Sequence, residues 1–167
     1  MVITMEIERK FTVRALPERL SQYPFHQIEQ AYLNTDPVVR IRKQDEEYYL
    51  TYKGKGLMAR EEYNLPLNRD SYYHLREKAD GNIIAKKRYL IPVEHPTFTS
   101  DYKSSNDQIS LTIELDIFDA PFGNLMIAEV EFPDEEMAAA FCPVEWFLDD
   151  VTNDPAYHNS NLSRKKI

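Results

Sequence analysis

Pairs of like-charged residues, each pair split by one residue, recur through the strand-like segments of this chain. The six pairs are Glu6 and Glu8 (with Lys10 following at the same spacing), Arg40 and Arg42, Lys53 and Lys55, Lys86 and Arg88, Glu114 and Asp116, and Glu129 and Glu131. Side chains alternate between the two faces of a strand, so both members of a pair project from one face. Because like charges on one face repel each other, any fold of this chain has to accommodate these charged faces.

The residues that separate the charges indicate what the opposite face does. They are Ile7, Ile41, Gly54, Lys87, Leu115 and Val130, and most of them are apolar. A single charged pair is most simply placed on the solvent face of an open sheet or a sandwich, since charged residues are mostly exposed. Six pairs with segregated signs favour a closed barrel, with the charged faces inside and the apolar faces packed outward. We therefore expect a β-dominated α+β fold, in which seven to nine strands form an antiparallel sheet that is closed as a barrel of about eight strands, with flanking helices, or folded as a sandwich.

Short runs rich in Val, Ile, Thr and Tyr, divided by prolines, predict where the strands lie. The chain has 10 prolines and 4 glycines, and no repeat or Ser/Gly-rich linker divides it. The expected strands cover residues 3–14, 28–35, 38–44, 47–54, 60–67, 85–93, 97–102, 109–118 and 126–132. Helices are expected over residues 69–79 and 134–142, with a third short helical segment over 144–149.

The overall charge and the single cysteine argue against several classes of protein. The 20 Lys and Arg against 28 Asp and Glu leave a net charge of −8, which disfavours nucleic-acid and membrane-surface partners. Cys142 alone cannot form an intramolecular disulfide and fits a reducing compartment. No segment is apolar over the roughly 18 residues that a membrane span needs. We therefore expect a cytoplasmic protein with one domain over residues 1–167.

The charged pairs also indicate a chemistry. Arginine and lysine side chains suit phosphate oxygens, and clustered carboxylates suit hard divalent cations such as Mg²⁺ or Mn²⁺. Together they indicate a metal-bound polyphosphate and phosphoryl transfer. The four histidines, His26, His74, His95 and His158, lack metal-ligand spacing and are expected at the surface or in supporting positions. Glycine-rich phosphate loops of the Walker or Rossmann type are absent from the sequence.

Several segments together resemble one known family. Glu6-Ile7-Glu8-Arg9-Lys10 resembles the Glu-x-Glu-x-Lys signature of the CYTH, or triphosphate tunnel metalloenzyme, superfamily. Further similar segments follow in order: Arg40-Ile41-Arg42, Lys53-Gly54, Arg60-Glu61-Glu62-Tyr63, Lys86-Lys87-Arg88-Tyr89, Glu114-Leu115-Asp116 and Glu129-Val130-Glu131. Residues 150–162 resemble the tail of small bacterial members. The resemblance implies an eight-stranded antiparallel tunnel with flanking helices, in agreement with the barrel inferred from the alternation of charges.

The resemblance also implies roles for individual residues. The metal ligands that it implies are Glu6, Glu8 and Glu131, with Glu129 close by. The triphosphate would be bound by Lys10, Arg40, Arg42, Lys53, Arg60, Lys86 and Arg88, with Lys55 at the tunnel mouth. Glu62, Glu114 and Asp116 would complete the acidic side, by binding a second metal or orienting water. The implied catalytic set is therefore Glu6, Glu8, Lys10, Glu62, Glu114, Asp116, Glu129 and Glu131. Asn64 departs from the family pattern, since related chains often carry an acid there.

The function that this reading favours is hydrolysis of a linear triphosphate, dependent on Mg²⁺ or Mn²⁺. Inorganic tripolyphosphate is the first candidate substrate, giving pyrophosphate and phosphate. An adenylate cyclase of the same superfamily and a thiamine or nucleoside triphosphatase are the enzymatic alternatives. A polyphosphate- or nucleotide-binding module without catalysis is the non-enzymatic alternative. An exposed face of the sheet could also support a homodimer.

Overall fold

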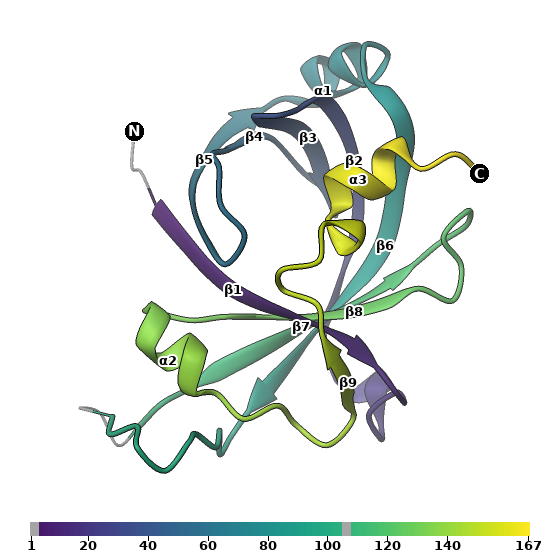
Figure 1. Cartoon of the computed structure of the whole chain (residues 1–167). Helices are drawn as coiled ribbons and strands as arrows, with labels where there is room; N and C mark the ends of the chain where they lie inside the picture. Colours follow the sequence, from purple (N-terminus) through teal and green to yellow (C-terminus); the bar gives the residue numbers. More distant parts are fainter. Residues whose placement is uncertain (1–3, 105–107) are drawn as a thin grey trace.

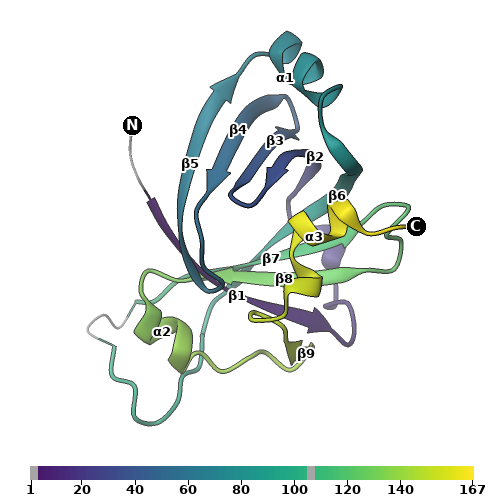
Figure 2. The same ribbon diagram turned by 45° about the horizontal axis from the view of Figure 1, so that its top comes forward.

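The computed structural model of this chain describes residues 4–104 and 108–167. Eight antiparallel strands form a sheet in the order β5-β4-β3-β2-β6-β7-β8-β1, and β1 pairs back to β5 (Figures 1 and 2). The strands are β1 (Thr4–Val13), β2 (Phe25–Thr35), β3 (Val38–Gln44), β4 (Glu47–Lys53), β5 (Ala59–Leu67), β6 (Asp80–Val93), β7 (Leu111–Phe118) and β8 (Met126–Glu131). The predicted eight-stranded closed barrel is confirmed.

Strand β1 closes the barrel and also carries a ninth strand. One edge of β1 pairs with β8 from Glu8 to Thr12, and the other edge pairs with β5 only from Thr4 to Ile7. Beyond that point the short strand β9 (Phe147–Asp150) takes over, with Phe11 opposite Asp150. The backbone groups of β1 that β5 does not reach therefore still find partners, as buried backbone groups require.

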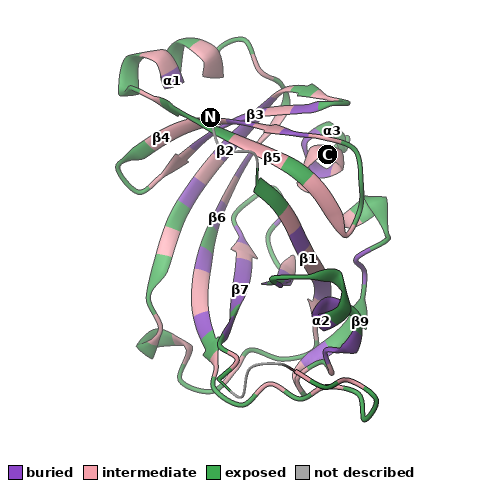
Figure 3. Ribbon diagram, turned by 90° about the vertical axis from the view of Figure 1, so that its left-hand side faces the viewer, coloured by how far each residue is buried: buried purple, intermediate pink, exposed green. Residues whose placement is uncertain are grey.

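Most of the apolar residues pack on the outside of the barrel. One cluster lies between β1, β6, β7, β8 and helix α2 (Glu135–Ala140), and it contains Ile7, Leu115 and Val130. A smaller cluster around Ile41 lies beneath helix α1 (Arg69–Arg76). Burial accordingly changes from residue to residue along β6 and other strands (Figure 3). The apolar residues between the charges thus face outward against helices, as expected.

A third apolar cluster lies inside the barrel and fills one end of it. Its members are Tyr32, Val38, Ile84, Phe118, Phe122, Ile127 and Leu162. Several of them alternate in step with the charged residues, as Val38 does with Arg40 and Ile84 with Lys86, so they share the inner face. Leu162 comes from helix α3 (Asn159–Arg164), which lies over the ring of strands in Figures 1 and 2. The apolar end and α3 together leave the rest of the interior to the charged side chains.

Two of the expected elements are wrong. Residues 97–102 form only an isolated bridge between Phe98 and Phe141, because their backbone bonds to the chain at the end of α2, with the Thr99 amide donating to Ala140 and the Cys142 amide to Thr97. The helix expected over 144–149 is replaced by β9, which pairs with the edge of β1 that β5 leaves free. The short helix at Pro155–Tyr157 and α3 were not expected from the sequence. In the described part of the chain, no helix is long and apolar enough to cross a membrane.

Candidate active site in the barrel interior

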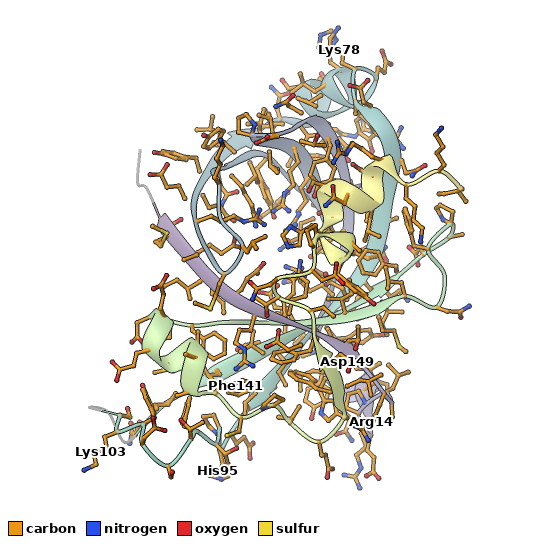
Figure 4. The ribbon with its side chains drawn as sticks, in the orientation of Figure 1. Arg14, Lys78, His95, Lys103, Phe141 and Asp149 are labelled. Carbon is orange, nitrogen blue, oxygen red and sulfur yellow. The ribbon has the colours of Figure 1, made fainter. Side chains whose placement is uncertain are left out.

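A cavity of about 190 Å³ lies inside the barrel and is lined almost entirely by charged and polar side chains. The residues that line it are Glu6, Glu8, Lys10, Tyr32, Val38, Arg40, Arg42, Lys53, Arg60, Glu62, Arg88, Glu114, Glu129, Glu131, His158, Asn159 and Ser160. Figure 4 shows side chains with nitrogen and oxygen tips pointing into the ring of strands. Most of the candidate site residues from the sequence are therefore brought together in one place.

The signs of charge are segregated around the barrel. The acidic pairs lie on the adjacent strands β7, β8 and β1, and the basic residues lie on β6, β3 and β4. Strand β2 separates β6 from β3 and contributes the neutral side chains of Gln30 and Tyr32 to this basic side. Lys10, Arg60 and Glu62 are exceptions, because they lie on β1 and β5, where the two walls meet. The cavity thus has an acidic wall and a basic wall.

Strand register pairs most of these charges with a partner of opposite sign. Four such pairs lie directly across a ladder: Lys10 and Glu129, Arg60 and Glu6, Lys53 and Glu62, and Arg88 and Asp116. Their nitrogen-to-oxygen distances are 3.4, 3.8, 3.1 and 2.7 Å, respectively. Opposite charges in facing positions stabilise a sheet, so these pairs support the barrel itself.

Two cross-strand pairs instead place carboxylates opposite each other. Glu114 and Glu129 both form ion pairs with Arg88, which bridges them. Glu8 and Glu131 also lie opposite each other, and no ion pair joins either to a cation among the described residues. Burial, followed by the charges of Glu129 and Glu6, raises the pKa of Glu8 to about 7. Burial and neighbouring carboxylates also raise the pKa of Glu131, so this pair needs a cation.

The basic wall contains two buried arginines that form no ion pair among the described residues. Arg40 is 6% exposed, and its Nε atom is buried without a hydrogen-bond partner. Arg42 donates from Nη2 to Gln30 Oε1 at 2.8 Å and from Nη1 to the Tyr49 hydroxyl at 3.4 Å, both neutral groups. Burial, together with the charges of Arg40 and Arg88, lowers the pKa of Arg42. Burial opposes the charge of Arg40 as well, but Tyr32 and the charges of Glu6 and Glu62 raise its pKa. A buried cation is costly unless an anion accompanies it, so Arg42 and the free Nε of Arg40 are suited to an anionic ligand.

Lys53 lies between two carboxylates where the walls meet. Its Nζ atom is 2.6 Å from Glu6 and 3.1 Å from Glu62. The Asn64 amide donates to Glu62 Oε1 at 2.8 Å, and its own oxygen accepts from the Thr51 hydroxyl at 2.6 Å. Although burial opposes it, Lys53 and the Asn64 hydrogen bond lower the pKa of Glu62 to about 2. The neutral residue at position 64 thus keeps Glu62 ionised, whereas an acid there would repel it.

Three candidate residues do not line the cavity. Lys86 and Asp116 are fully buried, with Lys86 Nζ 2.5 Å from Asp116 and 5.1 Å from the Phe118 ring centre. Burial lowers the pKa of Lys86 to about 8, although Asp116 opposes the shift. This pair supports Arg88 from below, because Arg88 Nε and Nη2 both donate to Asp116. Lys55 is exposed in the loop between β4 and β5.

The C-terminal segment supplies cavity residues that the sequence reading missed. His158, Asn159 and Ser160 line the cavity, and Asn159 Oδ1 is buried without a hydrogen-bond partner. His158 is half-buried and faces the cavity. Burial, followed by the charges of Lys10 and Arg60, lowers its pKa. No periodic pattern marks this segment in the sequence, so only the chain path could place it in the barrel.

The donor set fits a hard divalent cation that also binds the ligand. Among residues 4–104 and 108–167, no three His, Cys, Asp or Glu side chains converge as a ready set of metal ligands. Mg²⁺ usually takes one or two carboxylates together with water and phosphate oxygens, rather than a complete protein cage. The unpaired carboxylates of Glu8 and Glu131 match that requirement, and Glu6 lines the same cavity.

Comparison with known proteins identifies relatives over nearly the whole chain. The chain is 35% identical over 162 residues to an inorganic triphosphatase of Nitrosomonas europaea, covering 95% of this chain and 96% of the relative. It is 32% identical over 161 residues to an inorganic triphosphatase of Acetivibrio thermocellus, covering 94% of this chain and 92% of the relative.

Solved structures share the fold. A crystal structure of an inorganic triphosphatase superposes with a TM-score of 0.65 and 32% identity, covering 99% of this chain and 97% of that one. A putative adenylate cyclase from Bacillus halodurans has a TM-score of 0.51 and 16% identity, covering 93% of this chain and 100% of that one, which supports the fold alone. The model of the CYTH domain matches residues 4–138. With its charged closed barrel and these relatives, the chain belongs to the CYTH domain family.

Proposed function

We propose that this protein is a divalent-metal-dependent hydrolase of linear triphosphates, with inorganic tripolyphosphate as its preferred substrate. The observation that carries the proposal is that the cavity holds both cations and carboxylates without ion-pair partners of opposite charge. Within residues 4–104 and 108–167, neither Arg40 nor Arg42 forms an ion pair with a carboxylate, and Glu8 and Glu131 face each other without an ion pair to a cation. In a polyphosphate with a bound divalent cation, the phosphates neutralise the two arginines and the cation neutralises the two glutamates. The names of the two curated relatives support the same substrate.

Different residues of the cavity would bind the phosphates and the metal ion. Arg40, Arg42 and Lys10 would hold the phosphate oxygens and stabilise the charge that develops on them in the transition state. Mg²⁺ or Mn²⁺, held by Glu8, Glu131 and Glu6 with Glu129 nearby, would neutralise further charge on the phosphates.

Glu62 and Glu114, whose carboxylates line the cavity, would orient water for attack on a terminal phosphorus. Attack forms the new P–O bond and breaks the bond to the neighbouring bridging oxygen, the water gives up its proton to solvent, and orthophosphate and pyrophosphate leave.

Removal of divalent cations is expected to abolish turnover of tripolyphosphate. Without them, Glu8, Glu131 and the other carboxylates of the acidic wall repel a polyanion. Phosphate release should be measured on purified protein in excess chelator and then with Mg²⁺, Mn²⁺ or Ca²⁺ added back. Mg²⁺ and Mn²⁺ should restore activity, and Ca²⁺ should do so poorly because it prefers looser and more numerous ligands. Full activity in chelator would contradict the two-wall site.

Tripolyphosphate is expected to exceed ATP in kcat/KM by at least about tenfold, roughly 1.4 kcal/mol of transition-state binding. The reason is that the residues lining the cavity address phosphate and metal far more than any organic group. Phosphate, pyrophosphate and cyclic nucleotide should be measured together for both substrates. Cyclic AMP is expected as a trace at most. Equal efficiency with ATP would reject the stated preference.

One observation favours a substituted triphosphate as the second candidate substrate. A groove of about 700 Å³ shares Arg40, Arg42 and Glu62 with the cavity. It continues past Tyr49 and Leu65, which offer an aromatic ring and apolar surface to an organic group. A nucleoside triphosphatase or an adenylate cyclase would use that space, and cyclic AMP as the main product in the same panel would identify the cyclase.

A further inference from the structure

A polar cluster on the outside of the barrel lies directly behind the cavity wall. Arg9 stands between the cavity residues Glu8 and Lys10 in β1, so its side chain points to the opposite face. Its Nε and Nη2 atoms lie 3.1 and 2.7 Å from Asp150 Oδ2 on β9. Its Nη1 atom donates to the carbonyl oxygens of Ala138 at 3.0 Å and Phe141 at 2.8 Å, at the end of α2. Arg9 therefore ties β1 to two other elements.

Figure 4 labels residues on both of these elements. Phe141 lies at the end of α2, and Asp149 lies on β9 beside Asp150. The α2 carbonyls that Arg9 satisfies belong to the last turn, where a helix lacks its own donors. The Arg9 side chain is 14% exposed and the Asp150 side chain 41%, so the ion pair is partly open to water, whereas the bonds to the carbonyl oxygens of Ala138 and Phe141 are partly buried. The contact holds β1 through its geometry, because one guanidinium group binds a carboxylate with two nitrogens and two main-chain oxygens with the third.

The other oxygen of Asp150 continues the cluster to the main chain of Lys10. Asp150 Oδ1 accepts from the Thr152 amide at 3.0 Å and from the Thr152 hydroxyl at 2.5 Å. The same hydroxyl accepts from the Lys10 amide at 3.0 Å. Although partial burial opposes it, hydrogen bonding from Thr152 and Arg9 lowers the pKa of Asp150. The Thr152 hydroxyl, on a residue 6% exposed, therefore connects an ionised carboxylate to β1.

The segment that follows Thr152 enters the cavity. The Val151 amide donates to the Lys10 carbonyl oxygen at 2.8 Å, so residues 150–152 complete the edge of β1. Farther along, the Tyr157 carbonyl oxygen accepts from Lys10 Nζ at 3.5 Å. The next residues are His158, Asn159 and Ser160, which line the cavity. The cluster therefore holds both the backbone of Lys10 and the start of the segment that carries His158, Asn159 and Ser160 into the cavity.

We propose that Arg9, Asp150 and Thr152 are positioning residues for the active site, which fasten the C-terminal segment to β1 and so hold Lys10 and the wall of His158–Ser160 in place. None of the three lines the cavity, so they act on substrate through the residues that they hold. The effect on kinetics rests on the proposed function, whereas the effect on the position of the segment does not.

The test compares Thr152→Val with Thr152→Ser. Valine keeps the size of the side chain but can neither accept from the Lys10 amide nor donate to Asp150, whereas serine can do both. With Thr152→Val, we expect the KM for tripolyphosphate to rise about five- to tenfold and kcat to change less than about twofold. Thr152→Ser should restore the parent KM. Asp150→Asn, which weakens the link to Arg9 without removing the side chain, is the second variant.

Hydrogen exchange supplies a measurement that does not need substrate. In Thr152→Val, amides in residues 8–13 and 151–161 should exchange at least about threefold faster than in the parent protein. Arg76→Ala is the matched control, because it removes an ion pair of 2.8 Å with Glu29 beneath α1, away from the cavity. Arg76→Ala should leave both KM and the exchange of these segments unchanged.

The outcomes separate this proposal from the proposed function. Unchanged exchange in Thr152→Val would overturn the anchoring role, whatever the activity. Faster exchange with a KM equal to that of Arg76→Ala would overturn the link to the active site. If the parent protein did not hydrolyse tripolyphosphate, the proposed function would fail, and the exchange experiment would still decide whether the cluster anchors the segment.

Discussion

Replacement of Glu8 by Gln is expected to lower metal-dependent turnover of tripolyphosphate by about 10²- to 10³-fold. Glutamine keeps the size of the side chain but removes one of the two facing carboxylates that lack a cation. Glu131→Gln should act in the same direction for the same reason. The measurement is kcat/KM over a series of Mg²⁺ concentrations, where a weakened metal site moves the half-saturating concentration upward.

The same substitution is expected to stabilise the protein when metal is absent. The pKa of Glu8 is about 7 in the folded chain, against an ordinary value of 4.5. A carboxyl group with a raised pKa supports the fold fully below pH 4.5, and this contribution is lost as pH rises through 7. Above that pH the parent carries the full penalty, at most about 3 kcal/mol, and Glu8→Gln does not. Thermal unfolding at pH 5 and pH 8.5 in chelator should show a much larger gain at pH 8.5 than at pH 5.

Glu61→Gln is the matched control for both measurements. Glu61 is exposed on the outer face of β5, next to the cavity residue Glu62. Its replacement removes one negative charge from the same strand without altering the cavity, so turnover and the pH dependence of stability should stay those of the parent. A Glu8→Gln protein as active as Glu61→Gln would show that Glu8 is not a metal ligand.

Replacement of Arg40 by Met is expected to lower kcat/KM for tripolyphosphate by about 10²- to 10³-fold. Arg40 is a buried guanidinium with an unsatisfied Nε atom, and the part of the chain that the structure describes offers it no ion pair. Substrate phosphate is the anion that would satisfy it. Methionine retains much of the apolar stem, so the metal-free, substrate-free protein should unfold at an equal or higher temperature than the parent.

Loss of activity together with retained stability is the informative combination. Arg69→Met is the control, since Arg69 on α1 packs 5.2 Å from the Tyr73 ring centre and is exposed to solvent. This control should leave kcat/KM unchanged. If Arg40→Met unfolded more easily but bound tripolyphosphate normally, Arg40 would be a structural residue, and the assignment of the basic wall would be wrong.

The positions of the site residues show what the alternation of side chains along a strand can predict and what it cannot. Glu6, Glu8, Arg40, Arg42 and other paired charges face one cavity, as their spacing predicted. Alternation says which face a residue occupies but not how deep it lies. Lys86 and Asp116 have the same alternation as their neighbours, yet they are fully buried as a pair below Arg88. Depth depends on how neighbouring strands are staggered, which no single strand encodes.

The elements that the sequence reading missed depend on distant partners. Residues 147–150 form β9 only because β5 leaves part of β1 unpaired. Residues 97–102 have a strand-like composition but bond to the chain at the end of α2, so they form only one bridge. In both cases local preference is overridden by the availability of backbone partners elsewhere in the chain.

By itself, the sequence determined that the paired charges face the interior of a β-barrel and that most of the residues between them pack outside it. This follows from the two-residue period of a strand, which is a local property. Only the tertiary structure decided which charges neutralise each other and which, like Arg40 and Glu8, form no ion pair within the part of the chain that the structure describes. It also decided that Thr152 supports Lys10, 142 positions away. Such contacts arise from the register of closed strands and the return path of the chain, which no local pattern specifies.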